Sequence, residues 1–359
     1  MSNIFSTALT LLVFTILVVI HEFGHFAMAK KSGVLVEEFA VGMGPILLKK
    51  QMGETLYTIR AFPIGGFCRM LGDEEVYDNR GFNAKSPLSR ILILLAGPFL
   101  NFVFSFIIVF FLSATSTATA FPVINGFVDS ANAQSAGFEI GDEIVKIENE
   151  SIGTYQEMFF VLSNWGGNEL TVTVKRDGVK KEISVKPVFT DNNRWIIGIT
   201  PEIKTGIFAE NVAGYEKATL FDTTKDSIFL MRYYVKSVVV GFVRIFTLSI
   251  SPEEVSGPIG VVKIIDDNVS SNIQYGFRYA FSNLLVFMAL ISVNLSVLNL
   301  FPLPALDGGR VVLALIEMIR GKAMDPEKEG RLNYLGFLFL IAFAILVASN
   351  DVLQLIKGG

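Results

Sequence analysis

The stretch that decides the fold is FSTALTLLVFTILVVIHEFGHFAMAKK, residues 5–31, an apolar run that leads into two histidines and a glutamate. No Asp, Glu, Lys or Arg occurs before Glu22. Roughly 18–20 apolar residues are enough to cross the hydrocarbon core of a bilayer. The run has neither the basic flank nor the small-residue cleavage site of a signal peptide. We therefore expect a retained transmembrane helix over about residues 4–26.

The rest of the chain repeats this apolar pattern. Its 359 residues are 51% hydrophobic and 18% charged, whereas an average soluble domain is about 25% charged. Three further apolar runs predict transmembrane helices over about 91–113, 281–301 and 332–350. We expect a polytopic α-helical membrane protein with four transmembrane helices, divided into an N-terminal membrane part (1–114) and a C-terminal membrane part (281–359). The net charge of −4 argues against nucleic acid as a partner.

Basic residues predict how the chain is oriented in the membrane. They gather between the first and second predicted helices and between the third and fourth, while the flanks of the chain hold almost none. The positive-inside rule places both of these short loops in the cytoplasm. We therefore expect both termini, and the long region between the second and third helices, to lie outside the cytoplasm.

That long region is predicted to hold one small α/β domain over about 115–205. LTVTVK (170–175) and KKEISV (180–185) alternate with the two-residue period of strands around a turn. Within the segment 206–280 that follows, the stretch Asp226–Thr247 is apolar but carries Arg232, Lys236 and Arg244 near one helical face. The alternative for this stretch is a fifth membrane span. We expect a helix on the membrane surface there, because cations at the centre of a membrane span are costly.

The HEFGH motif is the strongest chemical signal in the sequence. His21 and His25 are the only histidines and stand four residues apart, so they share one helical face, with Glu22 beside them. Imidazoles at this spacing bind Zn²⁺, and the adjacent carboxylate can take a proton from a zinc-bound water. The alternative is a set of polar residues at a helix end without chemistry. The motif at the end of a charge-free helix favours zinc.

A hydrolytic zinc site needs a third protein ligand and an open fourth position. With no third histidine, that ligand must be a carboxylate or Cys68, the single cysteine. Asp307 is the best candidate, since it follows two prolines in NLFPLPALDGG (299–309) that cannot continue a regular helix. Irregular backbone at membrane depth is tolerated where it is buried or lines a cavity. The predicted topology also puts Asp307 on the cytoplasmic side together with the histidines.

Three further features point more weakly to substrate binding. Asn299 places an amide at membrane depth, where it could bind a substrate backbone or make an interhelical hydrogen bond. The loop at about 53–70 predicts a β-hairpin that re-enters towards the membrane and could hold an extended substrate at its edge. In AGPFLN (96–101) we expect Gly97 to allow close helix approach, without a direct chemical role for the motif.

Together these motifs resemble the site-2 protease family of intramembrane zinc metalloproteases, in its bacterial RseP-type branch. The resemblance rests on HEFGH, FPIGGF (62–67), AGPFLN, SGPIG (256–260) and NLFPLPALDGG, and AGFEIGDEIVKIE (136–148) is similar to a bacterial PDZ domain. It implies that His21, His25 and Asp307 bind zinc and that Glu22 activates water. It also implies substrate contacts, and these would be made by Asn299, Ile59, Pro63, Gly65, Gly66 and Phe67.

The resemblance further implies a place and a class of substrate. The protein would be a multi-pass protein of the bacterial inner membrane, with its PDZ-like domain extracytoplasmic and its active site near the cytoplasmic side. Substrates would be single-pass membrane proteins already cut by another protease, such as anti-sigma factors, or remnant signal peptides. Two alternatives stay open. One is a non-enzymatic PDZ-type peptide receptor with a vestigial metal site. The other is a membrane-bound protease of the zincin type, a class whose third zinc ligand is usually a His or Glu from a nearby helix, so that Asp307 would not be the ligand here.

Overall fold

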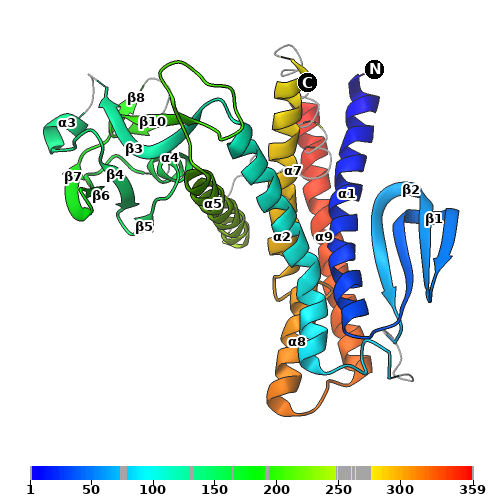
Figure 1. Cartoon of the computed structure of the whole chain (residues 1–359). Coiled ribbons are helices and arrows are strands. Elements are labelled where there is room, and N and C mark those ends of the chain that lie inside the picture. Colours follow the sequence, from blue (N-terminus) through cyan, green and yellow to red (C-terminus); the bar gives the residue numbers. More distant parts are fainter. Residues whose placement is uncertain are drawn as a thin grey trace. The chain divides into compact units, whose positions relative to one another are not determined.

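The structure, a computed structural model, describes residues 2–72, 79–128, 132–163, 165–190, 194–247, 249, 260, 263 and 276–357 (Figure 1). The chain forms two compact units, residues 1–105 together with 237–359, and residues 106–236. Residues 256–259, most of the SGPIG motif, lie outside the described residues.

Four of the described helices are long and apolar enough to cross a membrane, which confirms the predicted number of spans. They are α1 (Ser2–Lys31), α2 (Pro87–Thr115), α7 (Phe277–Asn299) and α9 (Pro326–Lys357). Most of these helices extend beyond the apolar runs into polar residues, since helical backbone continues to bond itself past the hydrocarbon region. The exception is the end of α7, two residues earlier than predicted. Pro302 explains this, because the residue before a proline is disfavoured in helical geometry.

Serine hydroxyls fix α2 against α7 at three levels. Ser296 donates to the carbonyl of Pro98 at 2.7 Å, and Ser292 donates to the carbonyl of Asn101 at 2.9 Å. One turn further along α2, Ser105 donates to a carbonyl of α7 at 2.7 Å. Small polar residues of this kind let membrane helices approach closely and hold one register.

A β-hairpin between α1 and α2 is larger than predicted. It pairs β1 (Val36–Met52) with β2 (Thr55–Met70) in antiparallel register. The prediction of a hairpin within 53–70 was wrong, because that stretch forms only the second strand. Gly42 and Gly44 have φ of +83° and +85° and bend the first strand back on itself. As a result residues 36–41 pair with 66–70 on one side and with 56–59 on the other.

A buried carboxylate ties this folded hairpin together. Glu38 is 2% exposed and accepts hydrogen bonds from Thr58 at 2.7 Å and from Arg60 and Arg69, both at 2.6 Å. Although burial opposes it, these three donors hold the pKa of Glu38 below its ordinary value. The hairpin is thereby a fixed platform rather than a loose loop.

The second unit contains a sheet in the order β11-β10-β3-β4-β6-β7, with helix α4 (Tyr155–Ser163) packed against its core. The strands are β3 (Thr119–Phe127), β4 (Glu143–Ile147), β6 (Leu170–Arg176), β7 (Val179–Val185), β10 (Ile199–Thr205) and β11 (Glu216–Lys217). Three shorter elements are β5 (Glu150–Ser151), paired with β4, and the separate hairpin of β8 (Val188–Thr190) and β9 (Arg194–Ile196). β6 and β7 form where the alternating pattern predicts them, around the turn at 177–178.

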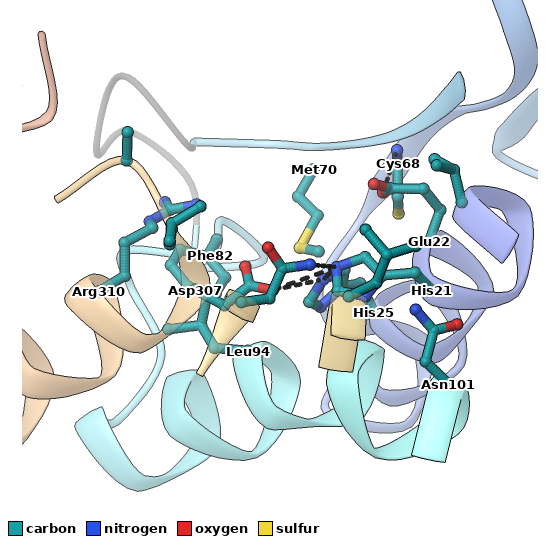
Figure 2. Close-up of a pocket in the computed structure, with 15 residues that line it drawn as sticks. His21, Glu22, His25, Cys68, Met70, Phe82, Leu94, Asn101, Asp307 and Arg310 are labelled. Carbon is teal, nitrogen blue, oxygen red and sulfur yellow. Dashed lines mark hydrogen bonds and ion pairs between the residues drawn. The ribbon is translucent and has the colours of Figure 1, made fainter. Parts of the chain in front are cut away.

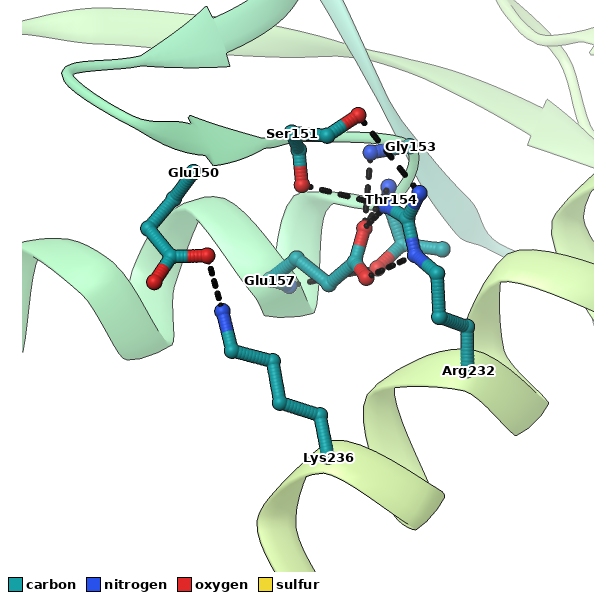
Figure 3. A network of polar contacts seen from close by, with 7 residues as sticks. All are labelled: Glu150, Ser151, Gly153, Thr154, Glu157, Arg232 and Lys236. Atoms are coloured by element: carbon teal, nitrogen blue, oxygen red, sulfur yellow. Dashed lines mark hydrogen bonds and ion pairs between the residues drawn. The ribbon is translucent and has the colours of Figure 1, made fainter. Parts of the chain in front are cut away.

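Helix α5 (Leu220–Phe246) attaches to this domain through its cations. Arg232 donates to both carboxylate oxygens of Glu157, at 2.9 and 2.6 Å, and Lys236 pairs with Glu150 (Figure 3). The prediction of a membrane-surface helix rested partly on these two cations, and that reason fails because carboxylates of the domain bind them. The position of α5 relative to a bilayer stays a prediction.

Candidate active site

The two histidines lie on the inner face of α1, where α2 packs closely against it. His21 is 8% exposed and His25 is 7% exposed. The Nδ1 atom of His25 lies 2.8 Å from the carbonyl oxygen of Ile93 on α2. A carbonyl only accepts, so Nδ1 carries the proton and Nε2 is left with the lone pair that binds a metal.

Gly97 makes room for both imidazoles. A Cβ atom at this position would lie 2.4 Å from Nε2 of His25 and 2.9 Å from Cε1 of His21. Only glycine allows α2 to pass this close to the rings. The expectation that Gly97 serves close helix approach is confirmed, and the approach is to the two predicted metal ligands.

Asp307 reaches the histidines because the chain unwinds before it. Helix α7 ends at Asn299, two prolines interrupt the next residues, and α8 (Asp307–Arg320) begins with Asp307 itself. Ala305 has φ of +73°, and its N–H donates to the side chain of Asn333 on α9 at 3.2 Å. A loop fixed in this way presents the carboxylate at the first residue of a helix, where the helix dipole favours negative charge.

The three predicted ligands form a compact triangle (Figure 2). Nε2 of His21 lies 3.0 Å from Nε2 of His25, and these two atoms lie 3.2 and 3.4 Å from Oδ2 of Asp307. In a tetrahedral zinc site with bonds of about 2.0–2.1 Å, ligand atoms are about 3.3 Å apart. The triangle therefore fits Zn²⁺, and among the described residues this is the one group of this kind.

Electrostatics agree with a cation at the centre of the triangle. Two imidazole Nε2 lone pairs 3.0 Å apart repel each other unless a proton or a metal ion lies between them. Without a metal ion, Nε2–H groups of the two histidines would have to donate to Oδ2 of Asp307. Although burial opposes it, those bonds and the charge of the protonated histidines hold the pKa of Asp307 well below its ordinary value. The donor set, two nitrogens and one carboxylate oxygen, is one that catalytic zinc uses.

Glu22 lies beside the triangle and contacts the hairpin. Its Oε2 accepts a hydrogen bond of 3.0 Å from the backbone N–H of Cys68 in β2. Glu22, Cys68 and the three ligands all line one cavity of about 340 Å³. The carboxylate that the motif predicts as a base is therefore held next to the metal site by main chain from another segment.

Asn299 is the one predicted substrate residue that lines this cavity. Its Nδ2 lies 3.4 Å from Nε2 of His21. The other five predicted substrate residues, Ile59, Pro63, Gly65, Gly66 and Phe67, lie on β2 but not in the cavity. Ile59 pairs with both Val41 and Leu48, so neither side of its strand can accept a substrate strand. Gly66 and Phe67 pair with β1 on one side only.

Met70 and Asn101 line the cavity but carried no predicted role, and Cys68 was named only as an alternative zinc ligand. Cys68 and Met70 lie just after the FPIGGF motif (62–67). The motif that suggested substrate binding therefore ends a few residues before the part of β2 that lines the cavity. Asn101 is the last residue of AGPFLN, a motif for which no direct chemical role was expected. Its four-residue spacing from Gly97 places it on the same face of α2.

Comparison with known proteins gives consistent matches along the chain. The profile of peptidase family M50 matches residues 9–343. A putative zinc metalloprotease of Clostridium acetobutylicum is 35% identical over 352 residues, which cover 98% of this chain and 98% of that protein. Zinc metalloprotease RasP of Shouchella clausii is 29% identical, and the match covers 96% of this chain and 97% of that protein.

One solved structure matches a smaller region. It is the PDZ domain of an SdrC-like protein from Listeria monocytogenes, 20% identical, covering 22% of this chain and 85% of that chain with a TM-score of 0.20. A likeness of this size does not establish the fold of the region.

Proposed function

Because this chain belongs to peptidase family M50 and is a zinc metalloprotease with membrane-spanning helices, we propose that it cleaves single-pass membrane proteins within or beside their transmembrane segments. The observation that supports the proposal is the triangle of His21, His25 and Asp307 with Glu22 beside it. All four residues lie at or near the ends of the apolar helices α1 and α7. The peptide bond to be cut would therefore have to reach the site near the end of a membrane span.

We assign each residue of the site a role. His21, His25 and Asp307 would hold the zinc, and Glu22 would take a proton from the attacking water and return one to the leaving amine. Bound zinc supplies a water of lowered pKa and polarises the peptide carbonyl. Asn299, whose amide lies next to His21, is placed to bind the substrate backbone or the oxyanion.

The substrate would bind as an extended strand. A transmembrane helix hides its own peptide groups, so it must unwind before hydrolysis. Because the N–H of Cys68 points to Glu22, away from β1, the backbone groups of Gly66 and Met70 point the same way. This edge, residues 66–70, is the part of the hairpin best placed to pair with an unwound segment.

The charge pattern supports a specific topology. We propose that the loops 32–86 and 300–325 are cytoplasmic, which puts the site near the cytoplasmic face of a bacterial inner membrane. The sheet domain would then be extracytoplasmic. There it could act on substrates that another protease has already shortened, whether anti-sigma factors or remnant signal peptides.

The Glu22→Gln variant tests the proposal. It should retain about one zinc per chain and lose cleavage of a transmembrane substrate, since the amide cannot take a proton. Quantitative proteomics of membranes carrying the wild type or Glu22→Gln should show transmembrane fragments that accumulate only in the variant. Substantial turnover by purified Glu22→Gln would refute the assignment of the base. Wild-type protein that purifies without zinc would favour a peptide receptor instead.

A further inference from the structure

The amide of Asn101 is the least satisfied buried side chain of the catalytic cavity. Asn101 is 0% exposed, and neither its Oδ1 nor its Nδ2 has a hydrogen-bond partner among the described residues. Its backbone carbonyl is already engaged by Ser292. The unmet polarity therefore belongs to the side chain alone.

The position of this amide is set by the packing that forms the metal site. Along α2, the carbonyl of Ile93 contacts His25, and Gly97 faces both imidazoles. Asn101 is one turn further on the same face, and Val18, one turn before His21 on α1, lines the cavity with it. In Figure 2 Asn101 and Asp307 lie on either side of the histidine pair.

Burial without a partner is unfavourable for an amide, more so at membrane depth. The buried serine hydroxyls between α2 and α7, by contrast, each find a carbonyl partner. The cavity measures about 340 Å³, whereas one water occupies about 30 Å³ of liquid. It therefore has room for an occupant much larger than a single water.

We propose that Asn101 binds one peptide group of the unwound substrate, on the side of the histidine pair away from Asp307. The inference rests on the proposed function. An asparagine side chain offers an acceptor and a donor from one planar amide, and a peptide group offers the complementary N–H and C=O. A lipid chain offers neither. Asn101 is thus a substrate-binding residue, distinct from the zinc ligands and from Glu22.

Asn101→Leu tests the inference, because leucine has a similar size and no amide. Purified variant and wild type are compared on a synthetic transmembrane peptide in detergent. We expect KM to rise about 10- to 100-fold with kcat within about threefold, zinc content unchanged, and the unfolding midpoint equal or higher. A purely structural amide would leave KM unchanged. Ser105→Ala, one turn along α2 and hydrogen-bonded away from the cavity, is the matched control.

A peptide series sharpens the test. Each peptide bond near the cleavage site is replaced in turn by an ester, which removes one N–H. At one position, the ester should raise the KM of the wild type but leave the KM of the Asn101→Leu variant unchanged. A double-mutant cycle requires this result for a direct contact between Asn101 and that peptide group. Asn101→Ala serves as a second variant if leucine does not fit. A KM within threefold of the wild type, or ester effects that are identical in both proteins, would overturn the inference.

Failure of the proposed proteolytic function can be told apart from failure of the role proposed for Asn101. If the wild type cleaves no transmembrane peptide, binding of the same labelled peptide is measured by anisotropy in the Glu22→Gln background. A Kd raised about 10-fold or more by Asn101→Leu supports the role of Asn101 on its own. An unchanged Kd refutes it.

Discussion

Asp226 makes the stability of α5 depend on pH. This carboxyl group is 6% exposed, and Ser113 of α2 donates a hydrogen bond of 2.9 Å to it. Burial raises the pKa of Asp226 from 3.8 to about 6, although the bond from Ser113 opposes the rise. Tyr234, also buried nearby, stays neutral in this range, since burial raises its pKa to about 12.

The sign of the effect follows from linkage. Between pH 3.8 and about 6 the unfolded chain has lost the proton while the folded chain keeps it, so stability falls as pH rises. At 1.36 kcal/mol per pKa unit the full loss is about 3 kcal/mol. Of this, about 1.3 kcal/mol falls between pH 5 and pH 7, and little changes above pH 7. Asp226→Asn keeps an acceptor for Ser113 but does not titrate.

Hydrogen exchange of the amides of α5, in the full protein in detergent, measures this difference. Comparing wild type with Asp226→Asn at each pH cancels the intrinsic pH dependence of exchange. We expect the opening constant of the wild type to rise about tenfold, relative to the variant, from pH 5 to pH 7.

Asp222, one turn earlier on the same helix, is the matched control. Although burial opposes it, the N–H and hydroxyl of Thr219 hold its pKa below the ordinary value. Its stabilising effect is therefore complete above pH 5, and Asp222→Asn should shift exchange equally at both pH values. A difference between wild type and Asp226→Asn that stays constant from pH 5 to pH 7 would refute the reasoning.

Two further predictions concern the metal site. Asp307→Ala should lower zinc affinity by more than the roughly 10–100-fold that loss of an outer-shell partner costs, and elemental analysis after dialysis against a chelator measures it. Retained zinc and activity would point to another third ligand. Gly97→Ala should displace the imidazoles, because its Cβ would lie 2.4 Å from Nε2 of His25, and should reduce both zinc affinity and cleavage. Gly330→Ala on α9, where a Cβ would meet nothing within 4 Å, should leave both unchanged.

The candidate metal site could be read from the sequence because its residues are rare and the spacing of the histidines is local. His21 and His25 are the only histidines and share a helix, so their spacing alone determines that they converge. Asp307 required an argument by exclusion, and the structure brings it within 3.4 Å of both histidines. The four membrane spans were equally readable, since apolar length is the property that the bilayer selects.

The strand pairing of the hairpin and the location of Asn101 at the cavity could not be predicted, for the same reason. Both depend on which segments pack together. Residues 55–61 alternate like a strand, but nothing in that stretch indicates that residues 36–41 pair with both 56–59 and 66–70. Similarly, an asparagine midway along a transmembrane helix, as Asn101 is in α2, is compatible with an interhelical hydrogen bond. Only the packing of α1, α2 and α7 shows that Asn101 lines the cavity and that its amide has no hydrogen-bond partner among the described residues.

The distribution of unmet polar atoms links the fold of the membrane unit to its chemistry. Among the described residues, six buried side-chain atoms lack a hydrogen-bond partner, and three of them, Nδ1 of His21 and both amide atoms of Asn101, belong to residues that line the catalytic cavity. Hydrocarbon cannot satisfy such groups, so at membrane depth they are costly and mark candidate functional sites. A peptide that unwinds in the bilayer also has unpaired polar groups, because each opened turn exposes N–H and C=O groups. Under the proposed function, binding at this cavity would satisfy both sets of polar groups, and this would favour the unwound substrate at the proposed cleavage site.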